Sequence, residues 1–175
     1  MSAKIRLATV WLDGCSGCHM SLLDNDERII DLAARATVVW GPLVDGKEFP
    51  ENVDVTLVEG AVSSEDDLHR IHLVRERTKI LVSLGDCAVT GNVPAMRNRF
   101  GVSAVLERAY IENAGLDPKI PRDVIPELLP HARPVHEVVP VDVHVPGCPP
   151  SADLIFSVLT DLLGGRKPQL HAKFG

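Results

Sequence analysis

Short apolar runs alternate with amphipathic stretches along most of this chain. The runs are rich in β-branched residues and end at glycine, proline or aspartate, as buried strands do. They cover residues 5–12, 36–43, 53–61, 79–85 and 140–147. Between or after most of these runs, apolar residues recur at helical spacing, over residues 20–34, 64–77 and 151–163. Alternating strands and helices predict parallel strands joined by right-handed crossovers, and therefore an open α/β sheet.

Residues 101–139 interrupt this alternation. The segment has room for at most one or two helices because prolines recur along it, at Pro118, Pro121, Pro126, Pro130 and Pro134. A segment this long and irregular is either a functional excursion or a partner-binding surface, and the sequence supports both interpretations. The whole chain has 175 residues, of which 45% are apolar, and this suits one sizeable core. We therefore predict a single domain over residues 1–175, with a proline-rich excursion at about 101–139.

Charge and hydropathy argue against two classes of function. The chain carries 18 basic and 24 acidic residues, a net charge of −6. Its basic residues are scattered without interleaved aromatics, which argues against nucleic-acid binding. No apolar stretch approaches the roughly 18 residues of a membrane span. Residues 1–4 lead directly into the first predicted strand without a secretory leader, so we expect a cytoplasmic protein in a reducing compartment.

All four cysteines follow predicted strands. Cys15 and Cys18 come after the first strand, Cys87 follows residues 79–85, and Cys148 follows residues 140–147. The carboxyl ends of parallel strands share one edge of a sheet, where ligand crevices form. We therefore expect these four side chains to converge. In a reducing compartment, such cysteines are better suited to metal binding or redox chemistry than to disulfides.

The spacing of the cysteines reduces the kinds of metal or cofactor site that they can form. The string C-x-x-C-H at residues 15–19 matches the attachment motif of c-type haem, but that attachment follows export. Four thiolates at one point hold zinc or an iron–sulfur cluster. Zinc sites with four cysteines usually combine two close pairs, whereas here one close pair is joined by two single cysteines from distant loops. This pattern favours a cluster that spans several loops, with cysteines buried as small apolar side chains as the alternative.

The sequences around these cysteines resemble the proximal-cluster motifs in small subunits of [NiFe]-hydrogenases, most closely the short form in cytoplasmic NAD-reducing hydrogenases. The matching strings are VWLDGCSGCHMSLLD, VEGAV, LGDCAVTGNVPAMRN and VPGCPPSADLI, spread over about residues 5–163. The resemblance implies a flavodoxin-like open parallel sheet with helices on both faces. It also implies one [4Fe-4S] cluster, held by Cys15, Cys18, Cys87 and Cys148.

This resemblance implies a role in a hydrogen:NAD oxidoreductase. The chain would relay electrons between a large subunit that carries the nickel–iron site and a NAD-reducing diaphorase module of iron–sulfur and flavin subunits. A cluster held by four thiolates has no open coordination position, so this chain is expected to carry the relay and not the hydrogen-splitting site. Respiratory members of the family have a twin-arginine leader and an extension with two further clusters. Neither is found in this sequence, so we expect electrons to leave the single cluster directly into another subunit.

Two further residues are candidates for the same edge. Glu59, in the string VEGA, ends the third predicted strand, and the resemblance places a glutamate of this string near the cluster and the subunit interface. Proton transfer, tuning of the cluster and an interface salt bridge are all open for it. Trp11 is expected to cap the core at the end of the first strand, with contact to a flavin as the alternative.

Three other functions stay open. A flavodoxin-like carrier of FMN is one, although the phosphate loop of flavodoxins is rich in serine and threonine, and DGCSGCH offers only Ser16. A cluster subunit of a quinone reductase of the complex I type is another. In that subunit the first two ligands are adjacent cysteines, whereas two residues separate Cys15 from Cys18 here. A zinc- or disulfide-based regulator is the third.

Overall fold

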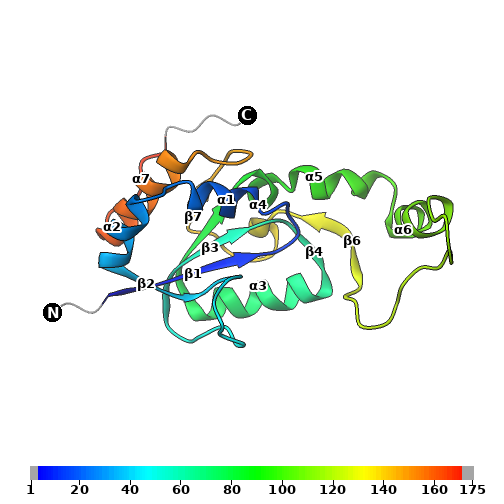
Figure 1. Ribbon diagram of the computed structural model, residues 1–175, viewed down its shortest axis with the longest axis horizontal. Coiled ribbons are helices and arrows are strands. Elements are labelled where there is room, and N and C mark those ends of the chain that lie inside the picture. Colours follow the sequence, from blue (N-terminus) through cyan, green and yellow to red (C-terminus); the bar gives the residue numbers. More distant parts are fainter. Residues whose placement is uncertain (1–3, 171–175) are drawn as a thin grey trace.

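A parallel sheet forms the centre of the protein. The computed structural model describes residues 4–170, and within them the main sheet has five strands in the order β2-β1-β3-β5-β7, every neighbouring pair parallel (Figure 1). The strands are β1 (Ile5–Trp11), β2 (Ala36–Trp40), β3 (Val53–Glu59), β5 (Thr78–Leu84) and β7 (Val143–Val145). This order is the flavodoxin-like one, so the predicted fold class is confirmed.

Helices cover both faces of the sheet and divide the core in two (Figure 1). On one face lie α1 (Gly17–Leu23), α2 (Arg28–Arg35) and α7 (Ala152–Leu163), and on the other lie α3 (Glu65–Arg77) and α4 (Asp86–Thr90). Side chains alternate between faces along a strand, so Leu7 packs with the α7 core while the adjacent Ala8 packs with the α3 core. Neighbouring residues of β1 therefore belong to two different apolar layers, one on each face of the sheet.

Helix α3 begins within one residue of its predicted start. The Ser64 hydroxyl accepts the Asp67 N–H at 3.2 Å, and the Asp67 carboxylate accepts the Ser64 N–H at 3.0 Å. These reciprocal bonds form a capping box that satisfies two backbone donors at the start of the helix.

The prediction of one continuous helix over residues 20–34 is wrong. The structure has two helices there, because residues 24–27 form a turn in which Asp26 adopts a left-handed φ of 48°. Side chains of Asp and Asn compete with helical backbone bonds, and Asn25 donates from Nδ2 to the Leu22 carbonyl at 3.0 Å. The first of the two helices also begins earlier than predicted, at Gly17, inside the cysteine motif.

The excursion at 101–139 contains more regular structure than predicted. Helix α6 (Val102–Glu107) continues into a π-helical segment (Arg108–Glu112), and the chain then returns through β6 (Leu128–Arg133). Strand β6 pairs antiparallel with β4 (Val62–Ser64), and this pairing was not predicted. Pro130 is compatible with β6 because this strand lies in a two-stranded sheet, where one side needs no ladder donor.

An extension projects from one end of the molecule. Helix α5 (Asn92–Ala95) and the 3-10 segment Met96–Arg99 lead from α4 to α6, which lies away from the main sheet in Figure 1. We call residues 91–127 the arm. Among the described helices, none is long and apolar enough to cross a membrane.

Candidate metal centre

Three loops at one edge of the sheet carry the four cysteines. Cys15 and Cys18 follow β1, with Cys18 in the first turn of α1; Cys87 lies in α4, after β5, and Cys148 follows β7. Cys18 is buried and Cys87 half-buried, while Cys15 and Cys148 are exposed, and all four are free thiols. The structure thus brings all four to the carboxyl edge of the parallel strands.

The pKa shifts of two thiols reflect the burial of these thiols and the charges of the neighbouring cysteines. Burial raises the pKa of the Cys18 thiol well above its ordinary value, and the charges of Glu59, Cys87, Cys15 and Cys148 raise it further. Burial also raises the pKa of Cys87, with contributions from Cys148 and Cys15. Because the charged forms are disfavoured, these thiolates need positive charge beside them, and metal binding here would release protons.

Backbone hydrogen bonds join the β1 loop to the end of β3. Leu12 donates its N–H to the Glu59 carbonyl at 2.8 Å, and Asp13 and Ala61 exchange bonds of 3.1 and 2.7 Å. Gly60 makes this approach possible: its φ is +94°, and a Cβ there would lie 2.7 Å from the Leu12 carbonyl carbon. The first cysteine loop is therefore positioned by main chain.

A second set of bonds joins the other two cysteine loops. Asp86 donates its N–H to the Gly147 carbonyl at 2.9 Å, and its carboxylate accepts the Gly147 N–H at 2.7 Å. Cys87 and Cys148 come directly after these two residues, so their spacing is set by this pair. The Ser21 hydroxyl donates to the Pro150 carbonyl at 2.5 Å and ties α1 to the same region.

The chemistry of the donor set fits an iron–sulfur cluster. Four thiols are soft ligands of the kind that iron–sulfur clusters and zinc select. In the part of the chain that the structure describes, no three His, Cys, Asp or Glu side chains group closely enough around one point to hold a metal ion. The backbone leaves room for sulfur, because a Cβ on Gly85 would lie 2.2 Å from Cys18 Sγ.

Glu59 lies inside this site and is paired with a residue that sequence reasoning did not single out for function. It is 2% exposed, accepts the His19 N–H at 2.9 Å and also contacts His19 Nδ1. Within the described residues, His19 Nε2 is buried and has no hydrogen-bond partner. The position of His19 in the C-x-x-C-H string was the only signal that could have pointed to it.

Residues of the turn after α4 contact two of the cysteines, and the sequence carried no signal for this. Asn92 donates from Nδ2 to Cys148 Sγ at 3.5 Å. The backbone N–H of Val93 donates to Cys87.

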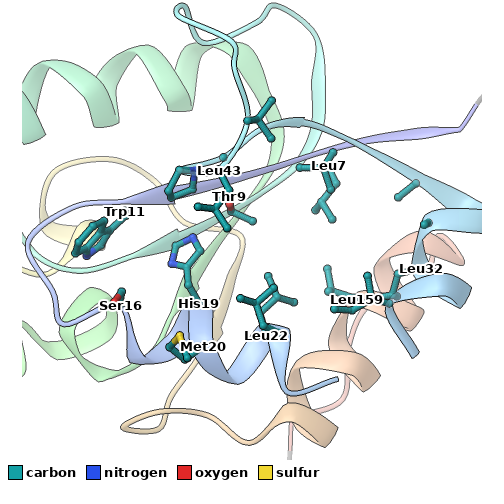
Figure 2. Close-up of a pocket in the computed structure, with 18 residues that line it drawn as sticks. Leu7, Thr9, Trp11, Ser16, His19, Met20, Leu22, Leu32, Leu43 and Leu159 are labelled. Carbon is teal, nitrogen blue, oxygen red and sulfur yellow. The ribbon is translucent and has the colours of Figure 1, made fainter. Parts of the chain in front are cut away.

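An apolar cavity of about 420 Å³ opens beside the cysteine edge (Figure 2). It lies between the β1–β2 face and helices α1 and α2, and Trp11, His19 and Leu43 are among its lining residues. Trp11 is 45% exposed, so the expectation that it caps the core is wrong. Among residues 4–170, no aspartate, glutamate, lysine or arginine lines the cavity, and the hydroxyls of the lining come from Thr9 and Ser16. This leaves little to hold the phosphate of a flavin nucleotide.

Comparisons with known proteins agree with the geometry. Residues 15–162 match the family model described as NADH ubiquinone oxidoreductase, 20 Kd subunit. The NAD-reducing hydrogenase HoxS subunit delta of Cupriavidus necator is 44% identical over 168 residues, which cover 93% of this chain and 80% of that protein. A vhu subunit of the F420-non-reducing hydrogenase of Methanocaldococcus jannaschii is 37% identical over 99% of this chain, which spans 61% of that relative's length.

Solved structures extend the match to the whole fold. A crystal structure of NAD+-reducing [NiFe]-hydrogenase in the H2-reduced state superposes with a TM-score of 0.94 and 40% identity, covering 99% of this chain and 100% of that one. A [NiFeSe]-hydrogenase chain of Dm. baculatum, at 18% identity and a TM-score of 0.63, shares the fold over 93% of this chain. The resemblance to small subunits of NAD-reducing hydrogenases is thereby confirmed.

The close approach of Gly85 to Cys18 generates a prediction. Gly85→Ala should lower the free energy of unfolding by more than Gly101→Ala, because Gly85 and Gly101 share nearly the same backbone (φ 82°, ψ 161° and φ 77°, ψ 159°) and both precede a helix. Within the described residues, a Cβ at Gly101 would meet nothing within 4 Å. The stability lost in Gly101→Ala therefore reports backbone strain alone, about 1–3 kcal/mol. Urea unfolding of both variants measures the difference; equal losses would show that the contact with Cys18 is easily relieved.

Proposed function

Because this chain belongs to the family of the NADH ubiquinone oxidoreductase 20 Kd subunit, we propose that it is the electron-transfer subunit of a cytoplasmic NAD-reducing [NiFe]-hydrogenase. It relays electrons through one [4Fe-4S] cluster, held by Cys15, Cys18, Cys87 and Cys148. The observation that carries the proposal is the convergence of four free thiols from three loops on one sheet edge.

The residues around the thiols suit a relay. When bound, the cluster supplies one-electron transfer without an open coordination position. The chain's part is to position the loops that carry the four sulfurs, and the bonds between the Asp86 and Gly147 backbones and between the Leu12 and Glu59 backbones support this role. Because these contacts are made by main chain, little reorganisation accompanies a change of charge at the site.

The role of Glu59 is narrowed by its burial. At 2% exposure and in contact with His19 of the same chain, its carboxylate is not presented to a partner, which disfavours an interface salt bridge. Its charge acts on Cys18 and Cys87 instead. We assign it to tuning of the site, with proton transfer through His19 as the alternative.

A relay needs a neighbour on each side, and the chain exposes two sets of apolar side chains. The first, which we call the cavity face, surrounds the apolar cavity and comprises Trp11, Met20, Leu23, Val38, Leu43 and Val44. The second lies on the arm and includes Val93, Met96, Phe100, Tyr110 and Ile111. Exposed apolar patches of this kind mark interaction sites. They support contacts with a large subunit that carries the nickel–iron site and with iron–sulfur and flavin subunits of a diaphorase.

The alternatives have less support. A flavin-binding carrier would use the cavity beside Trp11, whose lining lacks the hydroxyl-rich cradle of a phosphate loop. A quinone-reductase role is compatible with the family model. However, the C-x-x-C spacing and the 44% identity to a subunit of a NAD-reducing hydrogenase favour the hydrogenase branch.

Cluster content is the first test. Protein purified without oxygen should hold about four iron and four sulfide per chain and absorb broadly in the blue, as one cubane on four thiolates does. Cys15→Ser should lose iron and sulfide, because serine is a harder and poorer ligand. Ser16→Gly is the matched control, since glycine adopts the left-handed backbone of Ser16 (φ 61°) and removes no thiol. Stoichiometric zinc without acid-labile sulfide would contradict the proposal.

The relay role is tested by measuring hydrogen activation separately from the transfer of electrons to NAD. In the assembled complex, Cys87→Ser should reduce hydrogen-dependent NAD reduction far more than hydrogen exchange with deuterated water, because exchange needs no electron to leave. Both rates are measured on one preparation, after assembly has been checked by size-exclusion chromatography. Equal loss of the two rates would show that this chain shapes the hydrogen-splitting site itself.

Partner docking through the cavity face gives a third test. Val38→Asp places a charge among exposed apolar side chains and should weaken binding of the partner subunits by tenfold or more. The loss of one central apolar contact in an interface costs about 2 kcal/mol or more of binding free energy. Thr37→Asp adds the same charge to the same edge strand but on the opposite face of the sheet. Complex formation is measured by titration calorimetry. Equal affinities for both variants would place the partners elsewhere.

A further inference from the structure

The turn that connects α4 to α5 presents hydrogen-bond donors to two of the four thiols. Asn92 donates from its side-chain amide to Cys148 Sγ at 3.5 Å, a distance suited to a bond with sulfur. The next residue, Val93, donates its backbone N–H to Cys87. Two consecutive residues thus reach cysteines that come from different loops, one after β5 and one after β7.

The backbone of the turn fixes both donors. Gly91 and Asn92 have positive φ angles, 84° and 31°, so the chain reverses between the two helices. Asparagine is among the few residues other than glycine that adopt such angles readily. The Gly91 N–H donates to the Cys87 carbonyl at 3.0 Å, and its carbonyl accepts the Ala95 N–H at 3.0 Å. The position of the Asn92 amide is therefore set by the main chain on both sides.

We propose that Asn92, together with the Val93 N–H, sets the reduction potential of the cluster by donating hydrogen bonds to two of its thiolate ligands. The inference rests on the proposed function, because it concerns the cluster that these cysteines hold. Reduction adds one negative charge, which spreads over the sulfur atoms, and N–H donors stabilise that charge. Asn92 therefore raises the potential, and no bond is made or broken as the electron enters and leaves.

The chain places an opposing group on the other side of the same site. The buried Glu59 carboxylate acts on Cys18 and Cys87 and disfavours added negative charge there. Cys148 is exposed and receives its donor from Asn92, whereas Cys18 is buried close to Glu59. The donors of residues 92–93 thus raise the reduction potential, and the charge of Glu59 lowers it. Because the Val93 donor belongs to the backbone, a substitution at Asn92 is the direct way to remove a donor.

The test is a redox titration of the assembled complex, followed by electron paramagnetic resonance of the reduced cluster. Asn92→Gly removes the donor and keeps a residue that adopts φ 31°. It should lower the midpoint potential by about 59 mV, a tenfold change in the ratio of oxidised to reduced cluster for a one-electron couple. Asn92→Asp replaces the donor by a negative acceptor and should lower the potential further. Asn113→Asp, an exposed site at the end of the π-helical segment, adds the same charge and should leave the potential unchanged.

Each result separates this inference from the proposed function. A wild-type complex without iron and sulfide would overturn the proposed function itself. Variants that keep four iron per chain and titrate at the wild-type potential would overturn the role of Asn92 while leaving the relay intact. Loss of the cluster from the glycine variant would show that Asn92 holds the site together and does not tune it, and would also overturn the inference.

Discussion

Four groups that repel one another when charged are held within electrostatic reach, and this repulsion is the constraint on which the rest of the structure depends. Burial and neighbouring charges both disfavour the thiolate of Cys18. Main-chain hydrogen bonds hold the loops in place: the loop after β1 is bonded to the end of β3, and the loops after β5 and β7 are bonded to each other. None of these bonds depends on the protonation of a cysteine. A parallel sheet supplies the geometry, because its carboxyl ends share one edge.

Much of this architecture could be read from the sequence because it depends on local patterns. Strands β1, β3 and β5 differ from their predicted ranges by one or two residues, and α3 begins one residue after its predicted start. Placing the cysteines on one edge needed only the rule that parallel strands end together. The helix predicted over 20–34 failed because side-chain amides and carboxylates of residues 24–26 interrupt the apolar spacing.

The parts that could not be predicted depend on contacts between distant segments. Strand β6 pairs with β4 across more than sixty residues of sequence, and no local pattern records that pairing. The contact of Asn92 with Cys148 likewise needs a left-handed turn whose direction the sequence does not reveal. His19 pairs with Glu59 from another strand, so only the folded chain shows that the two form one unit. Candidate functional residues beyond the four cysteines were therefore the least accessible to sequence reasoning.

The unequal exposure of the cysteines has a consequence for biogenesis. Cys15 and Cys148 face solvent, whereas Cys18 is buried behind them. If the proposed cluster is built at this edge, its iron and sulfide can enter only while the exposed cysteines are uncovered. If a partner subunit covers the edge in the mature enzyme, maturation has a fixed order: the folded chain is loaded first and docked second. A chain that met its partner too early would then be trapped without the cluster, and the order of assembly would follow from the fold.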